Sequence, residues 1–274
     1  MKSINCKGTL IDFTTPKVMG ILNITPDSFY DGSKLKTDAA ILTQAETMLS
    51  EGATFLDVGG YSSRPGASDV PESEELRRVL PAIRLIINKF PDALLSVDTF
   101  RSNVARESVN AGAALVNDIS AGLLDENMIP TVADLQVPYI MMHMRGTPQT
   151  MKTLTDYEDV TLDILRYFSE RIAVARKAGI NDIITDPGFG FAKTIPQNFE
   201  LLGKLELFKN LDVPFLIGIS RKGMIYKTLN ISPAEALNGT TALNSIAVLK
   251  GASILRVHDV KQAVEAVKLI NSIP

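Results

Sequence analysis

The sequence is poor in the residues that most often bind zinc or form disulfides. It contains one cysteine, two histidines and no tryptophan among 274 residues. A Cys/His zinc site, a four-cysteine cluster and a disulfide framework each need more of these residues, so all three are excluded. If the chain is an enzyme, its chemistry must rest on carboxylates, amides, lysine, arginine and hydroxyl groups, with an oxygen-ligated metal ion at most.

An excess of positive charge and long apolar runs are also missing. Lys and Arg total 28 against 31 Asp and Glu, a net charge of −3, whereas proteins that bind nucleic acids or membrane surfaces usually have a basic excess. No apolar run reaches the roughly 18 residues of a transmembrane span, and residues 1–18 lack the apolar core of a signal peptide. Together with the lone Cys6, these absences predict a cytoplasmic protein that binds neither nucleic acid nor membrane.

Eight short runs rich in apolar and β-branched residues are present instead, and they predict strands. Several are apolar on both faces, which is typical of parallel strands covered by helices. The runs are Val18–Ile24, Thr54–Gly59, Leu94–Thr99, Leu115–Ser120, Pro138–Met144, Ile183–Pro187, Phe215–Ser220 and Ile254–His258. Segments of helical periodicity lie between them, at Thr37–Glu51 with Thr37 as its N-cap, Ser73–Lys89, Asp156–Ala178, Leu237–Lys250 and Val260–Ile273.

The spacing of these runs indicates the fold class. Successive strands begin about 20 to 45 residues apart, without a linker or a change in composition, as in a (β/α)8 barrel. A doubly wound open sheet is the alternative, but the sequence has neither a Gly-x-Gly-x-x-Gly turn nor a phosphate-binding P-loop. We therefore expect residues 1–274 to form a single α/β domain, a (β/α)8 TIM barrel.

Polar residues fall where most of these strands end, and that end carries the chemistry of such barrels. They are Asn23, Asp98, Asn117, Asp118, His143, Asp186, Ser220, Lys222, Arg256 and His258, and Arg64 follows the second strand. Taken singly, each also fits an ordinary structural role. Asp98 could cap the next helix, and His143 is expected to be a packing histidine.

Side-chain alternation along the strands limits which way the carboxylates of Asp57 and Asp118 can point. Asp57 precedes Val58 and Asp118 follows Asn117 along predicted strands. Because neighbouring strand residues point to opposite faces, at most one residue of each pair is expected to face the mouth of the barrel.

As a set, the strand-end residues predict a ligand. Asp98, Asn117 and Asp186 come from three strands that converge on one cavity. A carboxylate accepts N–H bonds and an amide both donates and accepts, which matches the edge of an aminopyrimidinone ring. Lys222 could reach the carbonyl oxygen of that ring. Leaving such groups buried and unpaired would cost about 1–3 kcal/mol each, so a bound heterocycle is their natural partner.

A second set predicts an anion site. Arg256 and His258 lie two residues apart and therefore share one strand face. With Arg64 they could hold phosphate oxygens, and Asn23 offers an oxygen ligand for Mg²⁺.

These motifs resemble those of the dihydropteroate synthases, pterin-binding enzymes of the folate pathway, over nearly the whole chain. The matching segments are Met19–Phe29, Asp57–Gly60, Ser63–Gly66, Ser96–Thr99, Asn117–Ser120, Met142–Gly146, Asp186–Phe191, Ser220–Lys222 and Arg256–Asp259. The resemblance implies a (β/α)8 barrel that condenses 6-hydroxymethyl-7,8-dihydropterin pyrophosphate with para-aminobenzoate. It also implies Mg²⁺ as the cofactor, a homodimer, and inhibition by sulfonamides.

The same resemblance implies the roles of individual residues. Asp98, Asn117, Asp186 and Lys222 would hold the pterin, with Ile119 and Met141 packed on its ring. Asn23, Arg64, Arg256 and His258 would hold the pyrophosphate, with Mg²⁺ bound through Asn23. Phe29, Ser63, Pro65, Phe191 and Ser220 would enclose para-aminobenzoate. Asp98, Lys222, Arg256 and His258 would carry the catalytic step.

Two departures from the family pattern keep alternatives open. Tyr61 stands where the family more often has Glu, and Gly223 where another polar residue is common. A non-catalytic pterin-binding paralogue is therefore one alternative. A methyltransferase between methyltetrahydrofolate and a corrinoid protein is another, although it would not need the phosphate-binding Arg and His residues. A Schiff-base role for Lys222 is a third, supported only by the neighbouring Arg221.

Overall fold

The structure is a computed structural model that describes residues 3–24, 34–61 and 70–273, without the side chains of 34–37. Eight parallel strands form one sheet in the order β8-β7-β6-β5-β4-β3-β10-β9. They are β3 (Lys17–Asn23), β4 (Phe55–Gly59), β5 (Leu94–Asp98), β6 (Leu115–Asp118), β7 (Tyr139–Met142), β8 (Ile183–Asp186), β9 (Leu216–Ile217) and β10 (Ile254–Val257). All eight predicted strands are therefore present, most of them one or two residues shorter.

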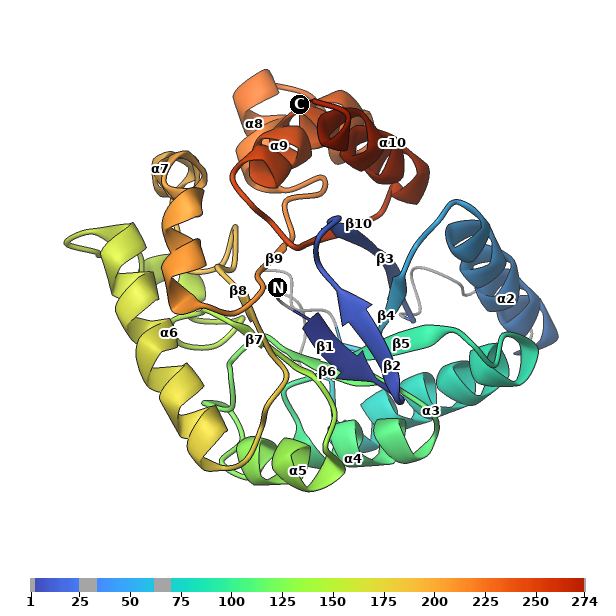
Figure 1. Cartoon of the computed structure of the whole chain (residues 1–274). Coiled ribbons are helices and arrows are strands. Elements are labelled where there is room, and N and C mark those ends of the chain that lie inside the picture. Colours follow the sequence, from blue (N-terminus) through green and yellow to red (C-terminus); the bar gives the residue numbers. More distant parts are fainter. Residues whose placement is uncertain (1–2, 25–33, 62–69, 274) are drawn as a thin grey trace.

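The sheet closes on itself between its first and last strands. Thr185 of β8 forms a parallel bridge with Phe215, next to β9, and its amide donates to the carbonyl oxygen of Pro214 at 3.1 Å. The predicted (β/α)8 barrel is confirmed, and Figure 1 shows the helices arranged around the strands.

The helices in the described part of the chain include four that the sequence did not predict. The long helices are α2 (Lys34–Ser50), α3 (Glu72–Lys89), α6 (Val160–Lys177), α9 (Leu237–Leu249) and α10 (Val260–Asn271). The unpredicted ones are α4 (Ser102–Asn110), α5 (Met128–Leu135), α7 (Ile195–Gly203) and α8 (Gly223–Leu229), each of nine residues or fewer. Short 3-10 helices lie at Met151–Thr153, Leu205–Leu211 and Pro233–Glu235.

Two predicted helix starts are wrong. Helix α2 begins at Lys34, so Thr37 lies inside it and is not its N-cap. Helix α6 begins at Val160 rather than Asp156, because the Asp159 carboxylate accepts hydrogen bonds from the amides of Thr161 and Leu162 and so caps the helix.

The amino-terminal end of the barrel is covered by a hairpin that the sequence did not reveal. Strands β1 (Ser3–Cys6) and β2 (Thr9–Asp12) pair antiparallel, and Figure 1 shows them lying across the strand ends. Ile4 and Cys6 are buried in one cluster with Met19 of β3, Phe55 of β4 and other residues that fill the barrel. The hairpin therefore completes the barrel core, and the functional residues lie at the other end, where the strands end.

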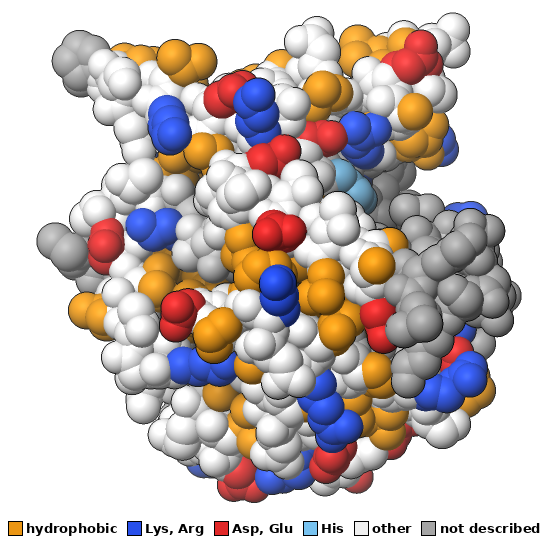
Figure 2. All heavy atoms as spheres, turned by 90° about the vertical axis from the view of Figure 1, so that its right-hand side faces the viewer, with side chains coloured by type: hydrophobic (Ala, Val, Ile, Leu, Met, Phe, Trp, Pro, Cys, Tyr) orange, Lys and Arg blue, Asp and Glu red, His pale blue; other side chains and the backbone are white. Residues whose placement is uncertain are grey.

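No helix in the described ranges is long and apolar enough to cross a membrane. On the face shown in Figure 2, Lys and Arg side chains are interspersed with Asp and Glu. This mixture fits the near-neutral net charge of the sequence.

Candidate active site at the carboxyl ends of the strands

An arginine at the centre of the barrel mouth joins carboxylates from two other strands. The Arg256 guanidinium of β10 donates from Nε to Asp57 Oδ2 at 2.6 Å and from Nη2 to Asp98 Oδ2 at 2.8 Å. Asn117 of β6 donates from Nδ2 to the same Asp57 oxygen at 3.0 Å. Residues from β4, β5, β6 and β10 thus meet in one network.

Asp57 is the site residue that the sequence reasoning left without a role. It is fully buried, and Oδ1 has no hydrogen-bond partner among the described residues, although Oδ2 receives two bonds. Alternation alone did not say which of Asp57 and Val58 faces inward. The sequence feature that could have identified Asp57 was its place in the Asp57–Gly60 motif.

Asp118 points away from this network, as alternation requires once Asn117 faces inward. Its carboxylate accepts bonds from Tyr139 Oη at 2.6 Å and from Ser120 Oγ at 2.8 Å. The expectation that one residue of the pair at most faces the mouth is confirmed, and Asp118 supports the surrounding loop instead.

A second pair lies on the opposite side of the mouth, at Asp186 and Lys222. Asp186 Oδ1 accepts the backbone N–H of Gly188 at 2.8 Å. Lys222 donates from Nζ to the carbonyl oxygen of Phe189, and Nζ lies 4.4 Å from the centroid of the Phe191 ring, in a cation–π contact. Lys222 is therefore fixed by the loop that follows Asp186.

Burial dominates the electrostatics of this end of the barrel. It raises the pKa of Asp98 to about 7, against the opposing effect of the Arg256 charge. Burial also raises the pKa of Asp186 and lowers that of Lys222 to about 8, although their opposite charges favour ionisation of both. Perturbed pKa values of this kind are typical of functional sites.

His258 and Ser220 form a direct contact between the loops after β10 and β9. Ser220 Oγ and His258 Nδ1 are 2.9 Å apart, and the backbone N–H of His258 donates to the same Oγ at 3.2 Å. The next residue, Arg221, makes a two-pronged ion pair with Asp259, with distances of 2.9 and 2.7 Å. His258, which we predicted to bind pyrophosphate, is thus held in place by Ser220, which we predicted to bind para-aminobenzoate.

Asn23 ends β3 beside the same network. A Cβ atom on the intervening Gly59 would lie 3.7 Å from both Asn23 Oδ1 and Asp98 Oδ2. Among the described residues, no group of three His, Cys, Asp or Glu could hold a metal ion. A single amide oxygen nevertheless fits Mg²⁺, which commonly takes one or two protein oxygens and completes its shell with substrate phosphates and water.

The prediction that Met141 packs on a ligand ring is wrong. Met141 is buried in the outer core, between the strands and the helices, whereas Met142 joins Ile119 and Met144 in a cluster at the barrel mouth. Residues one apart on a strand face opposite ways, so Met142 occupies the place that we assigned to Met141. Ile119 belongs to the same cluster as Met142, and its contact with a ligand ring stays a prediction.

His143 has the packing role expected of it. It is almost fully buried, stacks edge-on against Tyr167 at a centroid distance of 4.9 Å, and contacts Lys193 Nζ through Nδ1 at 3.0 Å. Burial and the Lys193 charge lower the pKa of His143 well below its usual range, so the ring is neutral.

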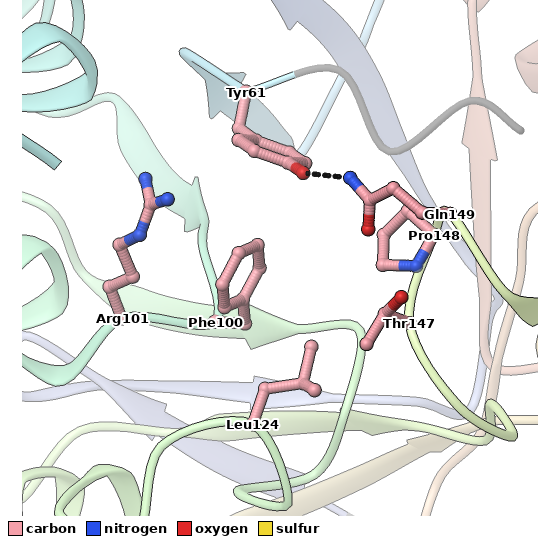
Figure 3. Close-up of a pocket in the computed structure, with 7 residues that line it drawn as sticks. All are labelled: Tyr61, Phe100, Arg101, Leu124, Thr147, Pro148 and Gln149. Atoms are coloured by element: carbon pink, nitrogen blue, oxygen red, sulfur yellow. Dashed lines mark hydrogen bonds between the residues drawn. The ribbon is translucent and has the colours of Figure 1, made fainter. Parts of the chain in front are cut away.

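A cavity of about 380 Å³ opens beside the mouth, among the loops after β4, β5, β6 and β7. Figure 3 shows its lining, formed by Tyr61, Phe100, Arg101, Leu124, Thr147, Pro148 and Gln149. Gln149 Nε2 donates to Tyr61 Oη at 3.0 Å, and the Tyr61 ring meets Phe100 edge-on. Tyr61, which replaces the more usual Glu, therefore links two loops through aromatic and amide contacts.

Four residues with predicted roles lie outside the described ranges. They are Phe29, Ser63, Arg64 and Pro65. Of the other residues assigned a role, Met141 is buried in the core between the strands and the helices.

The arrangement combines hydrogen-bonding groups for a planar heterocycle with cations for an anion. Asn117 uses Nδ2 on Asp57, so Oδ1 is left to accept, and the Asp186 carboxylate retains acceptor capacity beyond its bond to Gly188. Lys222 can donate to a ring carbonyl. Arg256 and His258 stand on the side where a departing phosphate could be neutralised.

Comparison with known proteins agrees with this chemistry. Residues 19–258 match the family model described as "Pterin binding enzyme". The dihydropteroate synthase of Escherichia coli K12 is 43% identical over 268 residues, which cover 97% of this chain and 94% of that protein. The Synechocystis dihydropteroate synthase is 43% identical over 93% of this chain and 89% of its own.

Solved structures of dihydropteroate synthases are also similar to this chain over nearly its whole length. The Yersinia pestis dihydropteroate synthase in complex with a sulfonamide drug has a TM-score of 0.92 and 40% identity, with 98% of each chain covered. The Xanthomonas albilineans dihydropteroate synthase in complex with 7,8-dihydropteroate has a TM-score of 0.89 and 37% identity, covering 99% of this chain and 100% of its own. The chain belongs to the pterin-binding enzyme family, among the dihydropteroate synthases.

Proposed function

We propose that this protein condenses 6-hydroxymethyl-7,8-dihydropterin pyrophosphate with para-aminobenzoate, giving 7,8-dihydropteroate and pyrophosphate. The observation that carries the proposal is the convergence of Asp98, Asn117, Asp186 and Lys222 at one end of the barrel. Its support from relatives is direct, because one Xanthomonas albilineans synthase structure contains 7,8-dihydropteroate and another contains 4-aminobenzoic acid.

The pterin binds through its hydrogen-bonding edge. The amino and ring N–H groups donate to the Asp186 carboxylate and to Asn117 Oδ1, while Lys222 Nζ donates to the ring carbonyl. Ile119 and Met142 supply the apolar surface against which the ring packs. Since these groups are buried, a ligand that lacked one matching donor would leave a polar group unpaired, at a cost of about 1–3 kcal/mol.

The leaving pyrophosphate takes up negative charge as its C–O bond breaks. Arg256 in β10 and His258 directly after that strand stabilise this charge, and we assign the same role to Arg64. We propose that Asn23 Oδ1 would hold Mg²⁺, which would supply further neutralisation of the pyrophosphate charge.

The amine of para-aminobenzoate then forms the new C–N bond and releases a proton. No protein nucleophile is needed, because the electron-rich dihydropterin stabilises the carbon that loses pyrophosphate. The Asp98 carboxylate adds electrostatic stabilisation when it is ionised. We propose that Phe191 and Ser220, with Phe29, Ser63 and Pro65, enclose the second substrate. We therefore also expect sulfonamides to compete there.

We further propose that the enzyme is a cytoplasmic homodimer. Exposed large apolar side chains on two neighbouring helices support a self-association surface. They are Leu229 of α8 and Ile246 and Leu249 of α9, and each is at least a third exposed. Light scattering on the purified protein tests this, and a monomer at micromolar concentration would contradict it.

Product analysis tests the proposed function. Purified protein with Mg²⁺ and both substrates is expected to form 7,8-dihydropteroate, measured by liquid chromatography and mass spectrometry. Lys222→Ala should mainly raise the KM for the pterin substrate, since its bond to the ring carbonyl is lost. Arg256→Ala should mainly slow the release of pyrophosphate. Absence of product from folded wild-type protein would contradict the proposal.

A further inference from the structure

Lys193 is a buried lysine that the reaction above does not use. It lies in the loop between β8 and α7 and its relative exposure is 8%. Burial lowers its pKa well below the usual range, and the Asp186 charge only partly opposes this. Because burying an ammonium group is costly unless it is paired, the reason for its position must lie in its contacts.

Those contacts use every donor that a lysine has. Nζ lies 2.9 Å from the carbonyl oxygen of Gly188, 3.0 Å from that of Phe191 and 3.0 Å from Nδ1 of His143. Three N–H groups therefore meet three acceptors, provided that His143 is neutral and carries its proton on Nε2. The depressed pKa of His143 is consistent with that state.

The same loop holds Lys222. Gly188 and Phe191, whose carbonyls bind Lys193, flank Phe189, whose carbonyl accepts Lys222 Nζ, and the Phe191 ring lies below that ammonium. Gly188 has a positive φ of 72°, and a Cβ atom there would collide with the backbone of His143. Gly190 has a φ of 80°, and a Cβ there would lie 3.2 Å from Lys222 Cδ. The loop thus fits closely between β7 and Lys222.

We propose that Lys193 is a positioning residue: anchored on His143, its ammonium fixes the Gly188–Phe191 loop so that Phe189 and Phe191 hold Lys222 ready to bind the pterin. Lys193 touches no substrate and acts through Lys222. The inference rests on the proposed function of that site, although its structural part can be tested without any substrate.

Hydrogen exchange tests the structural part. In Lys193→Met, which keeps most of the side-chain length but loses the three donors, we expect amides of residues 188–193 to exchange at least ~10-fold faster, as in a locally destabilised loop. Peptides from α3 and α10 serve as internal references. Lys204→Met, the matched control, removes an exposed lysine at the end of α7 that pairs with Glu200, and should leave the loop unchanged. Unchanged exchange in Lys193→Met would overturn the inference.

Kinetics test the connection to Lys222. Lys193→Met is expected to raise the KM for the pterin substrate ~10-fold, because one positioned hydrogen bond contributes on that scale. The basic limb of kcat/KM should also move upward by about one pH unit, since a partly hydrated Lys222 recovers part of the pKa that burial lowers. Asp186, Arg256 and Asp98 act on Lys222 and stay in place in the variant, whereas loss of the Lys193 charge removes a repulsion between the two lysines and adds to the upward shift.

A graded variant separates positioning from simple folding. Lys193→Gln keeps two N–H donors and should give intermediate values for both the loop exchange and the KM of the pterin substrate. If Lys193→Met does not fold, the same measurements are made on Lys193→Gln. Faster exchange throughout the chain with an unmoved basic limb would overturn the inference and leave Lys193 a purely structural role. If wild-type protein formed no product, the proposed function would fail, while the loop exchange would still decide the role of Lys193.

Discussion

At the scale of single residues, the Asp57–Arg256–Asp98 network determines how charge is distributed at the barrel mouth. Asp57 is the fully buried member, and it accepts bonds from both Arg256 and Asn117. Removing its charge leaves the arginine paired with Asp98 alone, inside the barrel. Asp57 therefore orients two groups that the substrate must meet.

Asp57→Asn is expected to lower the free energy of unfolding by about 3–5 kcal/mol, the usual effect of breaking a buried ion pair. Denaturant unfolding of variant and wild type measures the difference. Asp134→Asn is the matched control, because Asp134 pairs with Arg106 at 3.3 Å on the surface, with side chains 70% and 42% exposed. Exposed pairs contribute little, so the control should be unchanged. Equal effects in the two variants would show that the Asp57 pair adds no stability.

The raised pKa of Asp98 gives a prediction about pH. Asp98 must be ionised to stabilise positive charge, and its pKa is about 7 in the free protein. Lys222 must be protonated to give the ring carbonyl a charge-assisted hydrogen bond, and its pKa is about 8. The value of kcat/KM for the pterin substrate should therefore fall below about pH 7 and above about pH 8, a narrow bell. Initial rates from pH 5.5 to 9.5 measure both limbs.

Asp98→Asn provides the control for that profile. The variant cannot ionise, so it should lose the acidic limb and retain the basic one, with kcat/KM lower by a factor on the order of 10². If the acidic limb of the kcat/KM profile persisted in Asp98→Asn, a group other than Asp98 would be responsible for it. Arg256, Asp57, Glu75 and Asp118 are the charged neighbours that set this pKa.

At the scale of elements, the amino-terminal hairpin contributes to stability because it completes the core of the barrel. Ile4 of β1 has a relative exposure of 1% and belongs to the cluster that fills the barrel. Ile4→Ala should cost about 2–5 kcal/mol, because it leaves a cavity in a closed core. Leu10 of β2 is 70% exposed, and Leu10→Ala should cost about 0.5 kcal/mol or less. Similar costs for the two variants would contradict the account of the hairpin as part of the core.

The elements also show what the sequence could and could not predict. Buried parallel strands are continuous apolar runs, so all eight were recognised, and the long amphipathic helices were found for the same reason. The hairpin strands have four residues each, too few to establish a period. Helix α4 begins after Arg101, so Asp98 does not cap it, and its carboxylate bonds to Arg256 instead.

The site was predicted through strand ends, and its errors have a physical cause. Asn117, Asp186 and Lys222 lie at or after the carboxyl ends of strands, as expected, because those ends meet at one end of a barrel, and their roles toward a ligand stay predictions. The ring contact assigned to Met141 was wrong, and Asp57 was missed, because a shift of one residue along a strand reverses the face that a side chain occupies. The sequence could not give the partners of Lys193, since His143 is 50 residues away and the contact exists only in the folded chain.

At the scale of the whole molecule, a closed barrel brings residues from all parts of the chain to one end. Asp57 and Arg256 are 199 residues apart in sequence and share a hydrogen bond. The hairpin covers one end and the loops after the strands form the other, so the chemistry is confined to a single mouth. This confinement is consistent with a chain of one cysteine and two histidines that promotes the departure of a leaving group through charge.

The most direct test of the central claim is pyrophosphate release from the pterin substrate, measured with and without para-aminobenzoate in the presence of Mg²⁺. The account predicts release that depends on para-aminobenzoate and equals the 7,8-dihydropteroate formed, one for one. Tight binding of the pterin pyrophosphate without any release on adding para-aminobenzoate would contradict it, and the chain would then be a pterin-binding protein without synthase activity.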